Sequence, residues 1–259
     1  MYEKHYRTGL VLSGGGVRGF AHLGLLQALN EAGIFPDVIS GTSAGALAGA
    51  LYADGHTPEE ILKILNPGSM LDFLRPALPR EGLLQIGGII KILKNSLRAK
   101  TFEELKIPLY VTATDLNNGK AVYFSSGVLL EPVIASASIP VLFQPVTINN
   151  ILYVDGGVLD NMPLQPIENK CSFLIGSYVN PVGYIEKISG LINIAERTFM
   201  LSMSKEIYEK SKKLDLFIAP PELVSYKILD PEKAEELFMI GYNITKEKLK
   251  EIDMAKLYA

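Results

Sequence analysis

Several residue types and patterns are scarce or missing in this chain of 259 residues, and each absence excludes a class of protein. Its one cysteine, Cys171, allows no internal disulfide and no cysteine-based zinc site. No apolar run approaches the roughly 18 residues that a membrane-spanning helix needs. The net charge of −3 gives no overall basic footprint for nucleic acid. We therefore expect neither a spanning helix nor a nucleic-acid partner.

The start of the chain also lacks a targeting signal. Residues 1–8 carry several charges, and the short apolar stretch after them runs directly into glycines, without the apolar region and cleavage site of a signal peptide. With so little cysteine, this predicts a soluble cytoplasmic protein in a reducing compartment, and peripheral contact with a membrane stays open. We expect residues 1–259 to form one domain, because hydrophobic residues make up 48% of the chain and no linker interrupts it.

Short apolar runs alternate with helical patterns along the chain. Strands are predicted at residues 10–12, 38–39, 109–113, 121–124, 151–154, 173–179 and 216–218. Helices are predicted at residues 18–32, 44–52, 83–97, 129–138, 188–213 and 232–256, with another beginning at Thr57. This alternation predicts a three-layer α/β/α fold with a mainly parallel central sheet. Ligands of such sheets bind beyond the carboxyl ends of the strands, where several conspicuous motifs of this chain lie.

The serine of the sequence GTSAG at residues 41–45 is the best candidate nucleophile. Ser43 follows a predicted strand and precedes a helix of small residues, which is the setting of a nucleophile elbow. Gly41 and Gly45 would keep the crowded turn free of side chains. The turn would hold the Ser43 hydroxyl at the positive end of the following helix.

A glycine-rich loop with the sequence GGGVRG also follows a strand and opens a helix. It comprises Gly14, Gly15, Gly16, Val17, Arg18 and Gly19. Its spacing matches a dinucleotide-binding fingerprint, but the next strand ends without the acid that would bind a ribose, and no Gly-Lys-Ser/Thr follows as in a P-loop. We interpret it as an oxyanion hole in which the backbone N–H groups of Gly15 and Gly16, with Val17 as a third candidate, stabilise a tetrahedral oxyanion. Arg18 either pairs with an acid or a carbonyl or is a solvated charge.

The base cannot be the histidine of an α/β-hydrolase triad. That triad runs serine, acid, histidine along the chain, and the three histidines, His5, His22 and His56, do not allow this order after Ser43. A role of His22 as base outside such a triad stays open, but we expect it to be a packed or surface side chain, and we expect His56 to be exposed.

A carboxylate is the best remaining base. Asp155 is the strongest candidate because it follows the predicted strand at 151–154, and Gly156 and Gly157 allow a sharp turn there. A free aspartate is too weak a base for serine, but burial would raise its pKa. The lesser candidates are Asp160, Asp115 and Asp54.

The three motifs, in this order, resemble those of the patatin-like phospholipase family in its small bacterial form. Further matches are ATD at 113–115 and ASASIP at 135–140, and the resemblance covers roughly residues 8–180. It implies a Ser–Asp dyad, with Ser43 as nucleophile and Asp155 as proton acceptor. It also implies cleavage of acyl esters of lipids without a metal or cofactor.

The resemblance makes a serine acyl hydrolase of lipid or fatty-acyl esters the expected function. A catalytically silent lipid-binding or regulatory protein, and an acyltransferase or thioesterase on the same scaffold, stay open. Residues 8–180 would form the catalytic core, and residues 181–259 a mostly helical extension packed on it. Self-association is open as well.

Residues 66–98 are a candidate cap. The loop at its start is rich in proline and apolar side chains, and the following helix carries Lys91 and Lys94 beside an apolar face. Such a segment could dock on an anionic membrane. The alternative is a helix that simply packs on the sheet.

Overall fold

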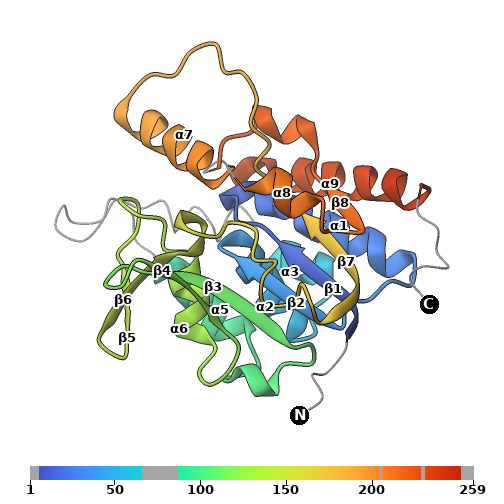
Figure 1. The fold of residues 1–259 in the computed structure, drawn as a ribbon, viewed down its shortest axis with the longest axis horizontal. Coiled ribbons are helices and arrows are strands. Elements are labelled where there is room, and N and C mark those ends of the chain that lie inside the picture. The colour runs from blue at the N-terminus through green and yellow to red at the C-terminus, as the bar shows by residue number, and fades with distance from the viewer. Residues whose placement is uncertain (1–5, 66–86, 205, 229–230, 252–259) are drawn as a thin grey trace.

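The computed structural model describes residues 6–65, 87–204, 206–228 and 231–251, and Figure 1 shows their arrangement. The strands are β1 (Tyr6–Leu12), β2 (Val38–Thr42), β3 (Leu109–Asp115), β4 (Lys120–Phe124), β5 (Val146–Ile148), β6 (Ile151–Asp155), β7 (Cys171–Ser177) and β8 (Leu216–Ile218). The helices are α1 (Phe20–Glu31), α2 (Ala44–Ala53), α3 (Pro58–Ile64), α5 (Gly87–Ser96), α6 (Leu130–Ser136), α7 (Leu191–Met203), α8 (Ile207–Ser211) and α9 (Ala234–Leu249).

All strands belong to one sheet in the order β5-β6-β3-β2-β1-β7-β8, with β4 also paired to β3. The five strands from β3 to β8 along this order run parallel to their neighbours, whereas β4 and β6 run antiparallel to β3. The predicted fold, a mainly parallel sheet with flanking helices, is confirmed. The short strand β5, which pairs antiparallel with β6, was not predicted.

The two faces of the sheet are covered by different segments. Side chains of a strand alternate between its faces. Leu10 and Leu12 of β1 belong to the large core cluster that also contains residues of α1, α2, α6 and α9. Val11, between them, belongs to a smaller cluster with Met162 after β6 and Ile207 of α8. The second face of the sheet is therefore covered by a smaller cluster of buried side chains.

The extension after β7 adds β8 to the sheet and packs α9 on α1. The two helices approach so closely that a Cβ added at Gly24 of α1 would lie 1.9 Å from the carbonyl oxygen of Phe238. A Cβ at Gly241 of α9 would lie 2.0 Å from the carbonyl oxygen of Ala21. Glycine at both positions is what allows this contact. Within the described ranges, no helix combines the length and the apolar character needed to cross a membrane.

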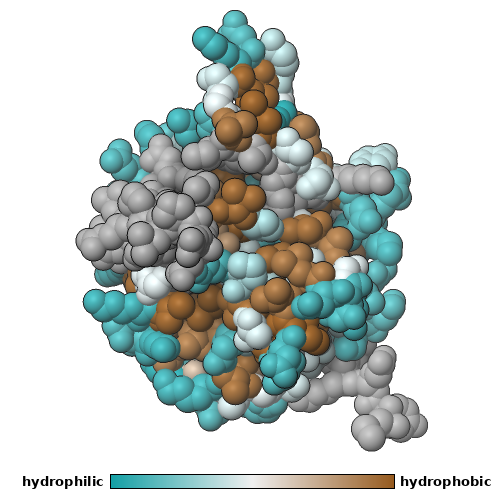
Figure 2. Space-filling model, turned by 90° about the vertical axis from the view of Figure 1, so that its left-hand side faces the viewer, coloured by the Kyte–Doolittle hydropathy of each residue, from teal (hydrophilic) through white to brown (hydrophobic). Residues whose placement is uncertain are grey.

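The predicted helix at 188–213 is two helices. α7 ends at Met203 and α8 begins at Ile207. The Ser204 hydroxyl donates to the carbonyl of Leu201 at 2.8 Å, a local bond that competes with further helix. α7 projects from the top of the molecule in Figure 1, and Figure 2 shows apolar surface on this projection. Tyr184, in the chain before α7, and Leu191, its first residue, are 89% and 86% exposed.

Candidate active site

The register of the sheet brings Gly14, Ser43 and Asp155 to one level. Leu12 of β1 pairs with Gly41 of β2, so the chain leaves β1 and β2 at the same height. Thr42 of β2 pairs with Thr112 of β3, and the next residue of β3, Ala113, pairs with Asp155. We expected three carboxyl ends of parallel strands, but β6 enters antiparallel. The carboxyl end of β6 still meets those of β1 and β2, because β6 starts beyond the edge at which these strands end and runs back toward it.

Ser43 sits on a strained turn between β2 and α2. Its φ of 54° and ψ of −119° lie outside the usual region for a residue with a side chain. The turn is crowded, since a Cβ at Gly41 would lie 2.6 Å from the carbonyl oxygen of Gly45, and one at Gly45 would lie 2.3 Å from that of Leu12. The two glycines therefore permit the close contact of α2 with the sheet, and the turn has the form of a nucleophile elbow.

Asp155 is a buried carboxyl that faces this serine. It is 1% exposed and lines a narrow cavity together with Ser43. The Asp155 Oδ1 accepts from the amide of Gly157 at 2.7 Å. Burial raises the pKa of Asp155 to about 7, against the opposing effects of the nearby Ser43 side chain and the Gly157 amide. A carboxyl with this pKa can exchange a proton with a serine hydroxyl near neutral pH far better than a solvated aspartate.

The end of α6 braces both residues. The amide of Ser43 donates to the hydroxyl of Ser136 at 2.8 Å, and the amide of Asp155 donates to the carbonyl of Ser138 at 2.9 Å. Both acceptors are fully buried. One short segment thus fixes the backbone of the serine relative to that of the aspartate. The sequence marked this segment only as a motif match, without a role.

The glycine loop lies beside Ser43 and presents free amides. Gly14, Gly15 and Gly16 line a narrow cavity together with Ser43 and Asp155. No described residue accepts a hydrogen bond from the amides of Gly15 and Gly16, whereas the amide of Val17 donates to the carbonyl of Ile228 at 2.9 Å. The two glycine amides can therefore donate to a ligand in the cavity, and Val17, our third candidate, is already engaged.

Arg18 anchors the loop to the extension. It is 3% exposed, so it is not a solvated charge. Its Nε donates to the carbonyl of Tyr226 at 2.8 Å, and its Nη2 donates to the same oxygen. Of the two alternatives that the sequence left, pairing with a carbonyl is the one observed. Gly19, next to it, lets the loop pack on α2, since a Cβ there would lie 2.5 Å from that of Ala44.

The comparison with known families agrees with this arrangement. A family model described as patatin-like phospholipase matches residues 10–167, more than half of the chain. This chain belongs to the patatin-like phospholipase family. The match spans the glycine loop, the serine turn and Asp155, and it ends before β7.

Individual relatives in the family are longer proteins. An uncharacterized NTE family protein of Mycobacterium tuberculosis is 37% identical over 163 residues, covering 62% of this chain and 45% of the relative. A lysophospholipase nte1 of Aspergillus terreus is 30% identical over 286 residues, covering 95% of this chain and 18% of the relative. The chain thus spans less than half the length of these relatives. VipD from Legionella pneumophila shares the fold, with a TM-score of 0.55 at 17% identity over 95% of this chain and 67% of that one.

His22 is packed in the core beside the glycine loop. It is fully buried, its Nε2 donates to the carbonyl of Ser13 at 2.8 Å, and its Nδ1 accepts from the Ser177 hydroxyl at 2.8 Å. Burial lowers the pKa of His22 to about 4. With both nitrogens engaged in hydrogen bonds and the ring neutral, His22 has a structural role. This agrees with the expectation that it is a packed side chain.

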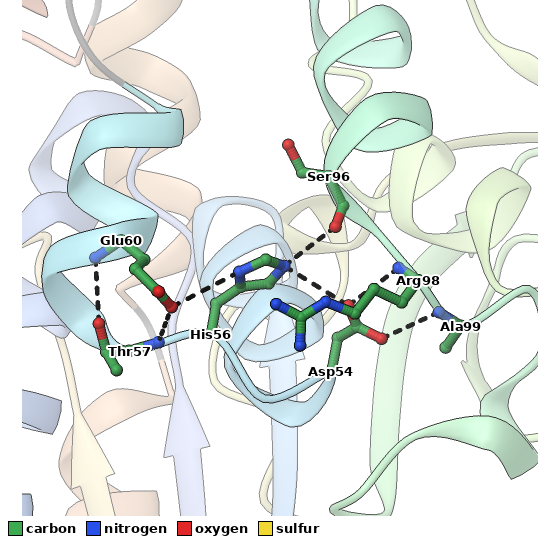
Figure 3. Close-up of polar contacts among 7 residues, drawn as sticks. All are labelled: Asp54, His56, Thr57, Glu60, Ser96, Arg98 and Ala99. Carbon is green, nitrogen blue, oxygen red and sulfur yellow. Dashed lines mark hydrogen bonds and ion pairs between the residues drawn. The ribbon is translucent and has the colours of Figure 1, made fainter.

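The prediction that His56 is exposed was wrong. Its side chain is only 10% exposed, and Figure 3 shows it between the start of α3 and the chain after α5. His56 Nε2 donates to the carbonyl of Ser96 at 2.9 Å, and the neighbouring Asp54 accepts from the amides of Arg98 and Ala99, each at 2.9 Å. This cluster joins α2 to the end of α5, a contact between segments too far apart in sequence to be predicted.

The lesser carboxylate candidates all have other partners. Asp54 belongs to the cluster around His56. Asp115 accepts from the amide of Asn118 at 2.9 Å and caps the turn after β3. Asp160 contacts the ammonium of Lys210 and accepts from the hydroxyl of Tyr123 at 2.7 Å. Asp155 is the carboxylate that lines the cavity with Ser43.

The candidate cap falls partly outside the described residues. Its first part, 66–86, lies outside them, and its helix appears as α5. Ile89 and Leu93 of α5 are buried in the core cluster, which favours the simpler alternative of a helix packed on its neighbours. Lys91 and Lys94 on the other side are exposed. Contact of this segment with a membrane stays a prediction.

Proposed function

We propose that this chain is a serine acyl hydrolase that cleaves lipid carboxylic esters, with Ser43 as nucleophile and Asp155 as base. The observation that carries the proposal is that Ser43 lines the same narrow cavity as a buried carboxyl whose pKa is raised to about 7. A purely structural aspartate gains nothing from such burial, because burial opposes its charge. A base for serine, in contrast, needs the raised pKa that burial produces.

The reaction proceeds in two steps. The Ser43 Oγ attacks the ester carbonyl while Asp155 takes the hydroxyl proton, and the amides of Gly15 and Gly16 stabilise the oxyanion. When the tetrahedral intermediate collapses, the C–O bond to the alcohol breaks and Asp155 returns the proton to the leaving oxygen. Water then attacks the acyl-enzyme as Asp155 accepts its proton, and the fatty acid leaves as Ser43 regains a proton. The acid–base group is the same in both steps.

An apolar cavity next to the site supports an acyl chain as part of the substrate. It lies between α1, α2 and α5 and has a cavity volume of about 50 Å³. Gly16 of the loop lines both this cavity and the narrow one at Ser43. Leu23, Leu47 and Ile92 are among the side chains around it. An ester carbonyl held at Ser43 would thus have its acyl chain beside an apolar space.

A fluorophosphonate probe tests the proposal directly. We expect wild type to be labelled on Ser43 and to hydrolyse nitrophenyl esters and lysophospholipids, and Ser43→Ala to lose both. Ser40→Ala is the matched control, because Ser40 is a fully buried serine of β2, the strand that leads to Ser43, and its hydroxyl hydrogen bonds to no described residue. It should be labelled like wild type. A wild-type protein that folds but is neither labelled nor active would refute the enzyme and favour a lipid-binding protein.

The same preparation separates a hydrolase from an acyltransferase. Both share the acyl-enzyme, and they differ only in whether water or an alcohol takes the acyl group. Products are measured with and without added glycerol or lysolipid. Release of free fatty acid that added alcohol leaves unchanged supports the hydrolase, and transfer that dominates over hydrolysis contradicts it.

A further inference from the structure

Gly14, whose carbonyl shares a peptide with the first oxyanion amide, is held in place by two asparagines. The amide of Gly14 donates to the carbonyl of Asn161 at 3.2 Å. The carbonyl of Gly14 accepts from the side-chain Nδ2 of Asn180 at 2.6 Å. Asn180 is fully buried and follows β7, beyond the part of the chain that the family model matches. The mechanism above gives Asn180 no role.

The planarity of the peptide links this bond to the oxyanion hole. In a trans peptide, the carbonyl oxygen of one residue and the N–H of the next point in opposite directions. Because Asn180 holds the oxygen of Gly14, the N–H of Gly15 must point away from that donor. No described residue accepts from this N–H, and Gly15 lines the cavity with Ser43. One hydrogen bond therefore sets the direction of a donor in the next residue.

The loop does not fix this orientation by itself. Glycines on both sides of the peptide leave its φ and ψ angles largely unrestricted, so the peptide can flip. A flipped peptide would turn the Gly14 carbonyl toward the reacting carbonyl and withdraw the Gly15 N–H. The oxyanion would then meet a partial negative charge in place of a donor.

We propose that Asn180 is a positioning residue of the oxyanion hole, an inference that rests on the proposed function. Its bond to Gly14 is not needed to join the two segments. They are also tied by the amide of Ser13, which donates to the carbonyl of Ser177 at 3.0 Å, and by the amide of Val179, which donates to the Ser13 hydroxyl at 3.0 Å. Asn180 adds a side-chain bond that acts on the peptide orientation.

Asn180→Leu and Asn180→Ala test the proposal with a trifluoromethyl ketone, which forms a tetrahedral adduct with the serine. Both variants lose the donor, and the smaller alanine is more easily tolerated if leucine prevents folding. We expect the inhibition constant to rise about 10- to 100-fold, with kcat/KM falling by the same factor and KM nearly unchanged. Rates are referred to active sites counted by fluorophosphonate labelling, so that a partly unfolded sample does not imitate the effect.

Ser13→Ala is the matched control. It removes a buried hydrogen bond between the same two segments without touching the Gly14 carbonyl. It should lower the melting temperature and leave the inhibition constant unchanged. A folded Asn180 variant with a wild-type inhibition constant would overturn the inference, as would an equal rise in Ser13→Ala. If wild type is neither labelled nor inhibited, the proposed function itself fails, which is a different outcome.

Discussion

Replacing Asp155 by asparagine should make the protein more stable while it abolishes the proposed activity. The carboxyl is buried, and its pKa is raised to about 7 in the folded protein. Its pKa in the unfolded chain is close to 3.9. Above neutral pH the folded protein must therefore hold an ionised carboxylate in surroundings that disfavour the charge. Asparagine has nearly the same shape without the charge, and its Oδ1 can still accept from Gly157.

The magnitude follows from the two pKa values. Between about pH 4 and pH 7, the folded state keeps the proton on Asp155 and the unfolded state releases it, so the free energy of unfolding falls as pH rises. The rise in the pKa of Asp155 from about 3.9 in the unfolded chain to about 7 in the folded protein lowers the free energy of unfolding by roughly 4 kcal/mol, at 1.36 kcal/mol for each pKa unit. This cost is absent below about pH 4 and complete above about pH 8.

Urea unfolding of wild type and Asp155→Asn measures this difference. We expect near-equal stability at about pH 4 and an advantage of several kcal/mol for the variant at about pH 8. Asp160→Asn is the control, because Asp160 is also buried but contacts Lys210. Its replacement removes the buried carboxylate of that ion pair and leaves Lys210 only the more distant and exposed Glu206, so stability should fall at pH 8. An Asp155→Asn advantage that does not change with pH, or that is absent at pH 8, would refute the reasoning.

Two further predictions address the chemistry and the extension. The kcat/KM for a soluble ester should rise with pH to a plateau with a midpoint near 7, because Asp155 accepts a proton only when ionised; a profile that is flat from about pH 5 to pH 9 would contradict its role. Gly24→Ala should destabilise the protein by about 1–3 kcal/mol or more, seen as a lower melting temperature, because its Cβ would overlap the Phe238 carbonyl of α9. Gly87→Ala, where a Cβ meets no described atom within 4 Å, should be close to neutral, and equal losses in both variants would count against the close contact.

The motifs indicated the main parts of the candidate site because each one depends on local geometry. The strand before Ser43, the glycines around it and the small residues of α2 are all adjacent in sequence, and a strand-to-helix turn accounts for them. The same holds for the glycine loop after β1. The fold class followed from alternation, which depends on burial along each segment and needs no knowledge of strand order.

The rest of the site depends on contacts between distant segments. Sequence spacing did not reveal that β6 runs antiparallel, because a strand pattern has no direction. Ser136 reaches the site as the last residue of α6, and Asn161 and Asn180 reach it from loops after β6 and β7, where a polar residue is usually only a turn former. His56 looked exposed for the same reason, since its partner Ser96 is far along the chain.

The contrast between His22 and Asp155 explains how a buried aspartate could replace a histidine here. Both side chains are buried, Asp155 in the cavity with Ser43 and His22 against Ser13 before the glycine loop, and burial moves the pKa of each toward its neutral form. The pKa of His22 falls to about 4, so the ring stays neutral, and both of its nitrogens form hydrogen bonds within the fold. The pKa of Asp155 rises to about 7, the range in which a general base works best. The environment that removes histidine as a titrating group is therefore the one that makes a carboxylate suitable.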